Sequence, residues 1–185
     1  MSTEPLTDVA RADLTKLGLA ELYELGDPEV RALLAEFLPL TQSSAIAIWV
    51  KDPEAEQLMP VLDTAGPEGA LEMKRPQPLS TGIVSQVYRE RKSFLESSLW
   101  RSKQRSLLVD QALDQETVNE MCVPFWVGGR LVGVVSAVQI MDEKHPQPKR
   151  WGFKEEDLQV LNVAAHALGL AMERAYWARR ATAQK

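Results

Sequence analysis

The stretch Met121–Ile140, MCVPFWVGGRLVGVVSAVQI, is the most apolar part of this sequence, and Gly128 and Gly129 interrupt it in the middle. A Gly-Gly pair between two apolar, β-branched runs predicts a β-hairpin, because both glycines can adopt the positive φ of a type I′ turn. Val127 should then pair with Arg130 across the turn. Both faces of this ribbon are apolar, whereas a hairpin with one solvated face would alternate apolar and polar residues. We therefore expect the hairpin at the centre of a sheet that is covered on both sides.

The register of this hairpin follows from counting outward from the turn. This register predicts two sets of cross-strand neighbours, one on each face of the hairpin, because successive side chains in a strand point to opposite faces. The first face carries Phe125 opposite Val132, Val123 opposite Val134 and Met121 opposite Ser136. The second face carries Trp126, Pro124 and Cys122 with Leu131, Gly133 and Val135.

Composition and charge limit the classes of protein to consider. The chain has 185 residues, 45% of them hydrophobic and 25% charged, which is typical of one globular domain with helical extensions. A net charge of -5 argues against nucleic acid as a partner, because binding to phosphates needs a basic face. Cys122 is the only cysteine, so the chain can form neither an internal disulfide nor a cysteine-based zinc site. This usage fits a reducing cytoplasm.

Two features of the sequence argue against export and membrane insertion. The N-terminal stretch MSTEPLTDVARADL carries acidic residues where a secretory signal would carry basic ones. The longest apolar run, Leu131–Ile140, is well short of the roughly 20 residues that cross a bilayer. We expect a soluble, cytoplasmic protein without a membrane partner.

Hydrophobic periodicity and turn residues predict the remaining elements. A long polar stretch between the predicted strands is a candidate lid, since such connections are usually functional or mobile. The predicted elements are a helix over Asp13–Leu25, a second helix capped by Asp27 with Pro28 first, strands over 44–50 and 57–63, a helix capped by Ser80 or Thr81, a short strand over 92–96, the lid over Ser97–Glu116, and a long helix over Lys154–Arg180.

The order of these elements resembles the GAF domain family over roughly Leu33–Tyr176. Three segments carry the resemblance, namely LSTGIVSQV at 79–87, MCVPFWVGGRLVGVV at 121–135 and FKEEDLQVL at 153–161. The resemblance implies an α+β, PAS-related fold, in which N- and C-terminal helices cover one face of a central antiparallel sheet. A ligand pocket lies on the other face, under a loop or helix lid. The implied division is a helical extension over 1–32, the GAF domain over 33–176 and a helix end over 177–185.

The resemblance also implies a set of ligand contacts. On the predicted register, the pocket face carries Met121, Val123, Val134 and Ser136. Asp63 and Thr117 would supply hydrogen bonds, the amides at the start of a helix would favour a carbonyl or an anion, and Trp100 could stack on a planar ring. Each side chain also has a purely structural alternative. The predicted ligand-binding residues are Ala47, Leu62, Asp63, Ile83, Val84, Trp100, Thr117, Met121 and Ser136.

A basic cluster surrounds the predicted lid and could attract an anionic ligand or partner. Its alternative is a solvated face of the protein. The cluster consists of Arg89, Arg91, Lys92, Arg101, Lys103 and Arg105.

The motifs of common catalytic and metal sites are missing, including GxSxG, HExxH, the phosphate loop and GxGxxG, so we predict no catalytic or metal-binding residues. Free methionine-R-sulfoxide reductases are an enzymatic branch of the GAF family, and their chemistry uses several cysteines. This chain has only Cys122. Neither His145 nor His166 lies beside that cysteine, so no covalent bilin is expected. A haem-ligating His166 is disfavoured against a packed or solvated histidine.

Cyclic-nucleotide-binding members of the family carry an Asn-Lys pair after the second hairpin strand, followed by a Phe and, four residues later, Asp-Glu. The matching positions here are Gln139 and Ile140, then Phe153 with Asp157 and Leu158. Because the lysine and the final acid are absent, binding of a cyclic nucleotide is not expected. Phe153 and Asp157 would instead anchor the start of the long helix.

Apolar residues of the long helix recur every three or four positions, which predicts a packing seam. In this fold such helices commonly pair between two protomers, so we predict a homodimer. The alternative is that the same stripe packs on the chain's own sheet. The seam consists of Leu158, Leu161, Ala165, Leu168, Met172 and Ala175, and the predicted dimer contacts are Leu168, Met172, Ala175 and Tyr176.

These observations favour a non-catalytic GAF sensory and regulatory domain of bacterial type. It would bind a small molecule and signal through a dimeric helical interface to an output domain or a separate signalling protein. The main alternative is a GAF domain without a ligand that serves as a dimerisation and docking module. A reductase-like enzyme is the third interpretation. The volume of the pocket should separate the first two interpretations, and the exposure of Cys122 should test the third.

Overall fold

The computed structural model describes residues 28–64, 75–99 and 108–183. Four helices and six strands are formed in these ranges. The helices are α3 (Pro28–Thr41), α4 (Ile83–Glu90), α5 (Leu108–Leu113) and α6 (Glu155–Ala183), and the strands are β1 (Ala45–Lys51), β2 (Gln57–Asp63), β3 (Gln77–Pro78), β4 (Phe94–Glu96), β5 (Thr117–Val127) and β6 (Arg130–Ile140). No described helix combines the length and apolar character that a membrane crossing requires.

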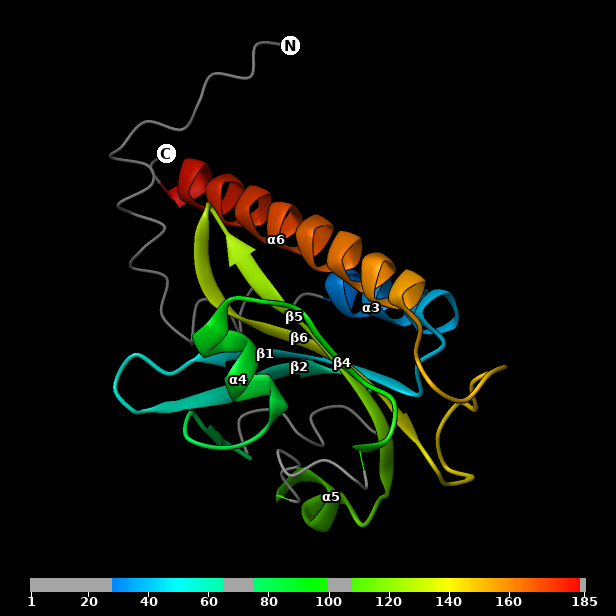
Figure 1. Cartoon of the computed structure of the whole chain (residues 1–185). Helices are drawn as coiled ribbons and strands as arrows, with labels where there is room; N and C mark the ends of the chain where they lie inside the picture. Colours follow the sequence, from blue (N-terminus) through cyan, green and yellow to red (C-terminus); the bar gives the residue numbers. More distant parts are fainter. Residues whose placement is uncertain (1–27, 65–74, 100–107, 184–185) are drawn as a thin grey trace.

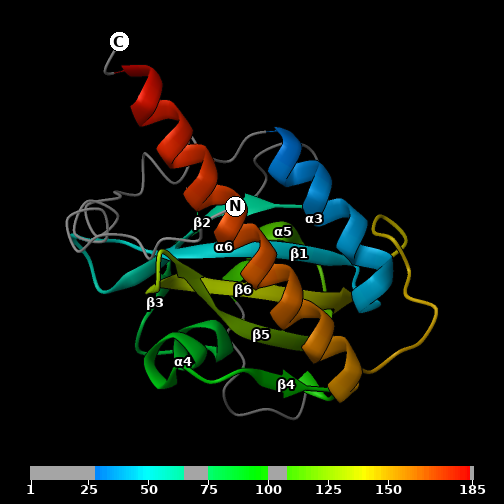
Figure 2. The same cartoon turned by 90° about the horizontal axis from the view of Figure 1, so that it is seen from above.

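The strands form one antiparallel sheet in the order β3-β2-β1-β6-β5-β4. Helices α3 and α6 lie on one side of this sheet, and α4 and α5 lie on the other (Figure 1). Seen from above, α6 runs obliquely across β5 and β6 with α3 beside it (Figure 2). The predicted α+β fold, with its hairpin at the centre of the sheet and its terminal helices on one face, is confirmed.

The central hairpin has the predicted turn but a different register beyond it. Gly128 and Gly129 have φ values of 58° and 78°, as the turn requires, and Val127 pairs with Arg130. The ladder then shifts between Phe125 and Trp126, because Val132 is an extra residue on β6. The predicted pairs of Phe125, Val123 and Met121 are therefore wrong. The observed pairs are Phe125 with Gly133, Val123 with Val135 and Met121 with Ala137.

The shift changes which side chains of β5 and β6 share a face of the sheet. Met121 and Val123 lie in the core beneath α6, whereas Cys122 packs with Val134 on the opposite face. A slip of one residue has this effect because the side-chain period of a strand is two. The expectation that Met121 and Val123 share a pocket face with Val134 and Ser136 is therefore wrong.

The apolar stripe of α6 covers the chain's own sheet. Five of its predicted seam positions are buried in the core that α6 forms with α3, β1, β5 and β6. Leu168 and Met172, predicted to contact a second protomer, are 0% and 2% exposed in this core and are not available to a partner. Tyr176 is partly buried against the same core, and the surroundings of the Ala175 side chain lie outside what the structure describes. The buried seam positions are Leu158, Leu161, Ala165, Leu168 and Met172.

Most of the other predicted elements agree with the structure where it describes them, but the predicted lid over Ser97–Glu116, which has no clear period in the sequence, contains the helix α5. β2 has the predicted bounds, α3 begins at Pro28, and KSFLE contains β4. The N-cap of α4 is Gly82, with φ 83°, rather than Ser80 or Thr81. Helix α4 begins only at Ile83, and the Thr81 hydroxyl instead accepts a hydrogen bond from Gln77 Nε2 at 3.2 Å within the preceding turn. The helix predicted over Asp13–Leu25 and the Asp27 cap lie outside the described residues.

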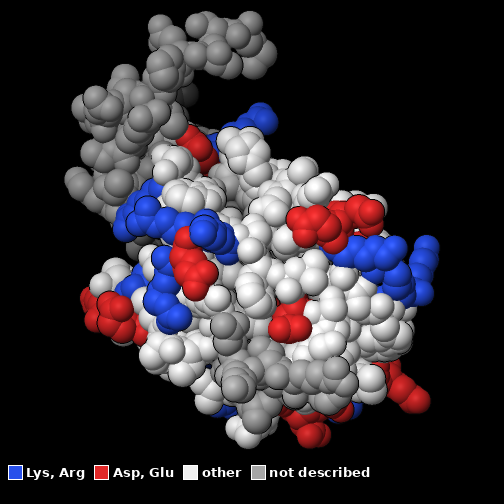
Figure 3. Space-filling view, viewed as in Figure 1, with Lys and Arg blue, Asp and Glu red and all other residues white. Residues whose placement is uncertain are grey.

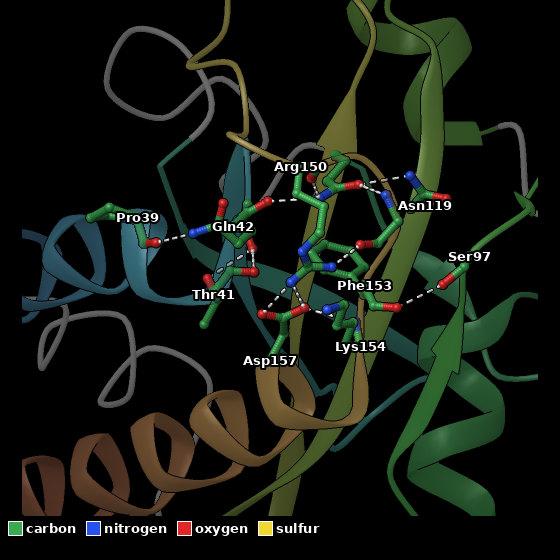
Figure 4. Close-up of polar contacts among 12 residues, drawn as sticks. Pro39, Thr41, Gln42, Ser97, Asn119, Arg150, Phe153, Lys154 and Asp157 are labelled. Atoms are coloured by element: carbon green, nitrogen blue, oxygen red, sulfur yellow. Dashed lines mark hydrogen bonds and ion pairs between the residues drawn. The ribbon is translucent and has the colours of Figure 1, made fainter.

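A buried polar network fixes the start of α6 (Figure 4). The Asp157 carboxylate accepts hydrogen bonds from the Lys154 backbone N–H at 2.7 Å and from Arg150 Nη2 at 2.8 Å. Gln139, which is fully buried at the end of β6, accepts from the Gly152 N–H and donates to the carbonyls of Arg150 and Gln42. The expected anchoring role of Asp157 is thus confirmed, and Arg150 supplies its cationic partner.

Asp157 should therefore contribute to stability through charge-assisted hydrogen bonds. We predict that Asp157→Asn lowers the free energy of unfolding by about 2 kcal/mol, since two donors lose an ionised acceptor. Urea denaturation measures this change. Glu155→Gln, at an exposed position in the same turn, is the control and should change stability by less than about 1 kcal/mol. Equal effects of the two substitutions would contradict the role of the network.

One glycine permits the close contact between α6 and the hairpin. A Cβ atom at Gly169 would lie 2.1 Å from the backbone oxygen of Trp126, so no other residue fits without moving the helix. We predict that Gly169→Ala lowers the free energy of unfolding by about 2 kcal/mol, although alanine is the better helix former. Differential scanning calorimetry tests this prediction, with Leu170→Ala on the exposed side of α6 as the control. A stabilised Gly169→Ala protein would show that the contact is not tight.

Candidate functional site

A cavity lies on the face of the sheet opposite α6, between β1 and β6 on one side and α4 and α5 on the other. Its volume is about 70 Å³, counted as the space that the centre of a water molecule can reach. One water needs roughly 10–15 Å³ of such space, so the cavity has room for about five water molecules. The described residues around it are Ala45, Ile46, Ala47, Trp49, Asp63, Gln77, Gly82, Ile83, Val84, Leu99, Val109, Asp110, Gln115, Thr117, Glu120, Ser136, Val138 and Ile140.

The floor of the cavity is formed by the middle of β1 and β6. Ala47 pairs with Ser136 and Trp49 with Val134, so these side chains share the face that turns away from α6. The indole Nε1 of Trp49 donates a hydrogen bond of 2.8 Å to the Ser136 hydroxyl. This bond satisfies two buried polar groups and holds the ring of Trp49 against the cavity.

The start of α4 forms one wall of the cavity. Gly82, Ile83 and Val84 line it, and Gly82 caps the helix without a side-chain hydrogen bond. The apolar side of α4 packs on the sheet, since Ile83, Val84 and Val87 belong to the core on this face. The first turn therefore brings backbone N–H groups and the positive end of the helix dipole to the cavity.

Short side-chain contacts join α5 to the start of β5 at another wall. The Thr117 hydroxyl donates to Asp110 Oδ1 at 2.6 Å, and the Thr117 backbone N–H donates to Asp110 Oδ2 at 3.3 Å. Gln115 Nε2 donates to the Thr117 hydroxyl at 3.4 Å. This end of the cavity is therefore polar and is dominated by oxygen acceptors.

Glu120, two residues before the cysteine on β5, lines the same end of the cavity. Burial raises the pKa of the Glu120 carboxyl to about 7. A hydrogen bond from the Cys122 thiol opposes this shift, and the charge of Asp110 adds to it. Near neutral pH, Glu120 is therefore a mixture of carboxylate and carboxylic acid, and small changes in its surroundings alter its charge.

The structure brings most of the predicted ligand-binding residues together. Ala47, Asp63, Ile83, Val84, Thr117 and Ser136 all line the cavity. Leu62 does not, because it neighbours Asp63 on β2 and so faces the core beneath α6. Met121 also faces that core, as a result of the register shift. Trp100 lies outside the described residues.

Sequence reasoning missed several polar lining residues. Glu120 was not predicted because the expected register placed Met121 on the cavity face, instead of Glu120 and Cys122. With the bulge included, strand alternation from Cys122 would have found it. The residues of the lid follow no period, so only the three-dimensional structure reveals them. The missed polar residues are Trp49, Gln77, Asp110, Gln115 and Glu120.

The other candidate groups do not form a second site of comparable definition among the described residues. Cys122 is fully buried, and burial together with Glu120 raises the pKa of its thiol well above the usual value. Within the described ranges, no three His, Cys, Asp or Glu side chains come together to hold a metal ion. His166 is exposed on α6, and His145 hydrogen-bonds to Asp142 at 2.8 Å in its loop.

Basic side chains gather over the region of α4, with acidic side chains between them (Figure 3). Arg89, Arg91 and Lys92 of the predicted basic cluster are exposed at the end of α4. None of the three lines the cavity. The remaining members, Arg101, Lys103 and Arg105, lie outside the described residues.

The architecture and the cavity agree with a match to a family model described as GAF domain, which covers residues 29–173. The chain belongs to the GAF domain family. Most members of this family are sensory or regulatory domains, and the match supports that general role for this GAF chain. None of the curated proteins is similar enough in sequence to count as a match.

Solved structures similar to this GAF chain share its fold at low sequence identity. The free methionine-R-sulfoxide reductase from Neisseria meningitidis, in complex with its substrate, is 15% identical, with a TM-score of 0.62 over 91% of this chain and 87% of that one. The GAF-B domain of DevS from Mycobacterium smegmatis is 22% identical, with a TM-score of 0.58 over 83% and 98%. The PixJ GAF domain from Thermosynechococcus elongatus, in its blue-light absorbing form, is 15% identical, with a TM-score of 0.61 over 91% and 96%.

The raised pKa of Glu120 predicts a pH dependence of stability. Because the folded protein holds this proton up to a pKa of about 7, whereas an unfolded glutamate releases it near 4.5, Glu120 stabilises the fold most below pH 4.5. That contribution is lost as the pH rises to 7. We predict that the free energy of unfolding of the wild type falls over this range relative to that of Glu120→Gln. Denaturation at several pH values tests this prediction, and parallel curves for the two proteins would contradict it.

Proposed function

We propose that this GAF domain is a non-catalytic sensor that binds a small molecule in the cavity between the sheet and α4 and α5. The open volume, lined by polar groups from β1, β2, β3, α5, β5 and β6, is the observation that carries the proposal. Apolar walls with a few converging polar groups are the usual composition of a small-molecule site. The similar structure of a reductase in complex with its substrate offers support by analogy, since that protein has the same fold.

The interpretation as a docking module without a ligand has less support. It requires a filled pocket, whereas two of the predicted pocket residues, Leu62 and Met121, do not line the cavity. Both lie in the core beneath α6, and the volume that they leave stays open. A binding cavity on one face and a separate apolar core on the other fit a sensor better.

The surroundings of Cys122 support a non-catalytic role. A thiol acts as a nucleophile only as the thiolate, and the raised pKa keeps Cys122 protonated near neutral pH. Full burial also keeps substrates from its sulfur. We therefore propose binding rather than reductase chemistry for this chain.

A chain of contacts offers a route from the cavity to α6. Thr117, which holds α5, pairs with Ile140 at the end of β6. Two residues further along β5, the amides of Asn119 and Gln139 lie 2.7 Å apart, and Gln139 contacts the loop that carries Arg150. Arg150 holds Asp157 at the start of α6. We propose that a ligand that changes the position of α5 biases the packing of α6 by this route.

We further propose that the protein is a bacterial, cytoplasmic homodimer. It would signal to an output domain or to a separate protein. Its GAF domain would span residues 33–176, between helical ends. The dimer would use the outer side of α6, because the predicted contacts Leu168 and Met172 face the sheet. Val163 and Leu170, one heptad apart, are 66% and 54% exposed there. Apolar residues at this spacing form a helix-pairing stripe.

Native mass spectrometry of the protein from a bacterial host, followed by denaturing release, tests ligand binding. We expect an added mass that is released on denaturation. It should be absent from Ala47→Leu, which reduces the cavity, and present in the exposed control Leu40→Ala. Circular dichroism confirms that both variants fold. A protein that carries no added mass, and whose Tm no nucleotide or metabolite changes, would contradict the sensor and favour the docking module.

The same spectra test the homodimer. We predict that Val163→Asp weakens dimerisation at least tenfold, because it places a charge in an apolar contact. Leu40→Ala, at an exposed apolar position on α3, is the control and should dimerise as the wild type does. A dimer unchanged by Val163→Asp and by Leu170→Asp would show that α6 does not form the interface.

A further inference from the structure

The end of the cavity near α5 presents hydrogen-bond acceptors rather than donors. Glu120, Gln115 and Asp110 supply oxygen atoms there, and none of the lining residues that the structure describes is a lysine, an arginine or a histidine. The hydroxyl of Thr117 is already used, since it donates to Asp110 at 2.6 Å. A ligand group that enters this end therefore meets acceptors first.

Gln115 supplies an acceptor without a partner. Its amide nitrogen donates to the Thr117 hydroxyl, whereas its Oε1 atom is buried and has no hydrogen-bond partner among the described residues. A buried polar atom without a partner destabilises the folded state, so such atoms are rare in folded proteins. A donor from a ligand would remove this destabilisation.

Glu120 also lies at the α5 end of the cavity, and its ionised carboxylate supplies a negative charge there. Its Oε1 atom accepts a bond of 3.4 Å from the Cys122 thiol, which is a weak donor. The groups that face Glu120 from neighbouring elements are Asp110 on α5, Glu96 opposite it on β4 and the apolar Val138 on β6. Among the residues that the structure describes, none of these groups is a cation, so the Glu120 carboxylate itself favours a ligand group of positive charge.

We propose that the ligand presents a positively charged N–H group, an amidinium or an ammonium, to Glu120 and Gln115 at the α5 end of the cavity. This inference rests on the proposed function of small-molecule binding and specifies the chemical class of the ligand. A cation with several N–H groups can donate to the Glu120 carboxylate and to Gln115 Oε1 together. The bond to the carboxylate is charge-assisted and is therefore the stronger contact.

The cation should bind more tightly as the pH rises. Its partner is the ionised form of Glu120, and the carboxyl has a pKa of about 7 in the protein without a ligand. Between pH 6 and pH 8 the ionised fraction increases about tenfold, so the affinity should increase by a similar factor. Asp110, Glu96 and Cys122 are the other titratable groups that the structure describes near this carboxyl.

Three probes of nearly equal shape separate the possible ligand classes. Acetamidinium is a cation, acetamide is neutral and acetate is an anion that could bind instead at the start of α4. The indole N–H signal of Trp49, which lines the cavity, reports binding in ¹H–¹⁵N spectra of the full chain. A Trp49→Phe protein assigns this signal among the five tryptophans. Each probe is titrated at pH 6 and pH 8.

We expect acetamidinium to shift the Trp49 signal at lower concentration than the other two probes, with about tenfold higher affinity at pH 8 than at pH 6. Glu120→Gln should weaken this binding at least tenfold and remove its pH dependence. Glu116→Gln, an exposed neighbour, is the matched control and should bind as the wild type does. The comparison of the three probes on the wild type tests the proposal even if Glu120→Gln fails to fold.

The remaining outcomes overturn the proposal in distinguishable ways. If acetamide or acetate binds at least as well as acetamidinium, or if Glu120→Gln binds acetamidinium like the wild type, the ligand class is wrong while the cavity remains a binding site. If none of the three probes shifts the Trp49 signal, the ligand class is wrong, and the proposed function fails as well only if native mass spectrometry finds no added mass.

Discussion

The ladder between β5 and β6 is the constraint on which the rest of the molecule depends. These strands are buried on both faces, so their register decides which side chains enter the core beneath α6 and which enter the cavity. The Gly-Gly turn sets the pairing at one end. The bulge at Val132 then offsets the two strands by one residue and places Ser136 opposite Cys122.

The order and type of the elements were predictable because they depend on patterns that few local exceptions disturb. The strand over 57–63, the hairpin turn and the long C-terminal helix follow from alternation, glycine pairs and helical spacing. The register did not follow, because one bulged residue leaves no mark in a run that is apolar on both faces. For this reason the prediction put Met121 on the cavity face, whereas the structure puts its neighbour Glu120 there. In a strand with a polar face, the alternation would have exposed the slip.

Some residues that line the cavity could be predicted from the sequence, and others could not. Positions at the centres of strands, such as Ala47 and Ser136, were found because secondary structure fixes where they point. Residues of the α5 wall, such as Asp110 and Gln115, approach the cavity only through the path of an irregular segment, and no period describes that path. The stripe on α6 shows a third case. Its spacing correctly predicted a buried face, but spacing does not say whether the covering surface belongs to the same chain or to a second one.

The close approach of α6 to the hairpin gives the helix a mechanical property. Contact with the Trp126 backbone at Gly169 acts as a fulcrum, with the polar network around Asp157 on one arm. The other arm runs to Ala183, and its end extends beyond the sheet (Figure 2). At 1.5 Å per residue, this arm is roughly 21 Å long. A tilt of about 5° at the fulcrum would displace its tip by roughly 2 Å. Because the arm from Gly169 to Asp157 is nearly as long, the same tilt would move the start of α6 by a similar distance, so the contact at Gly169 would couple the positions of the two ends of the helix.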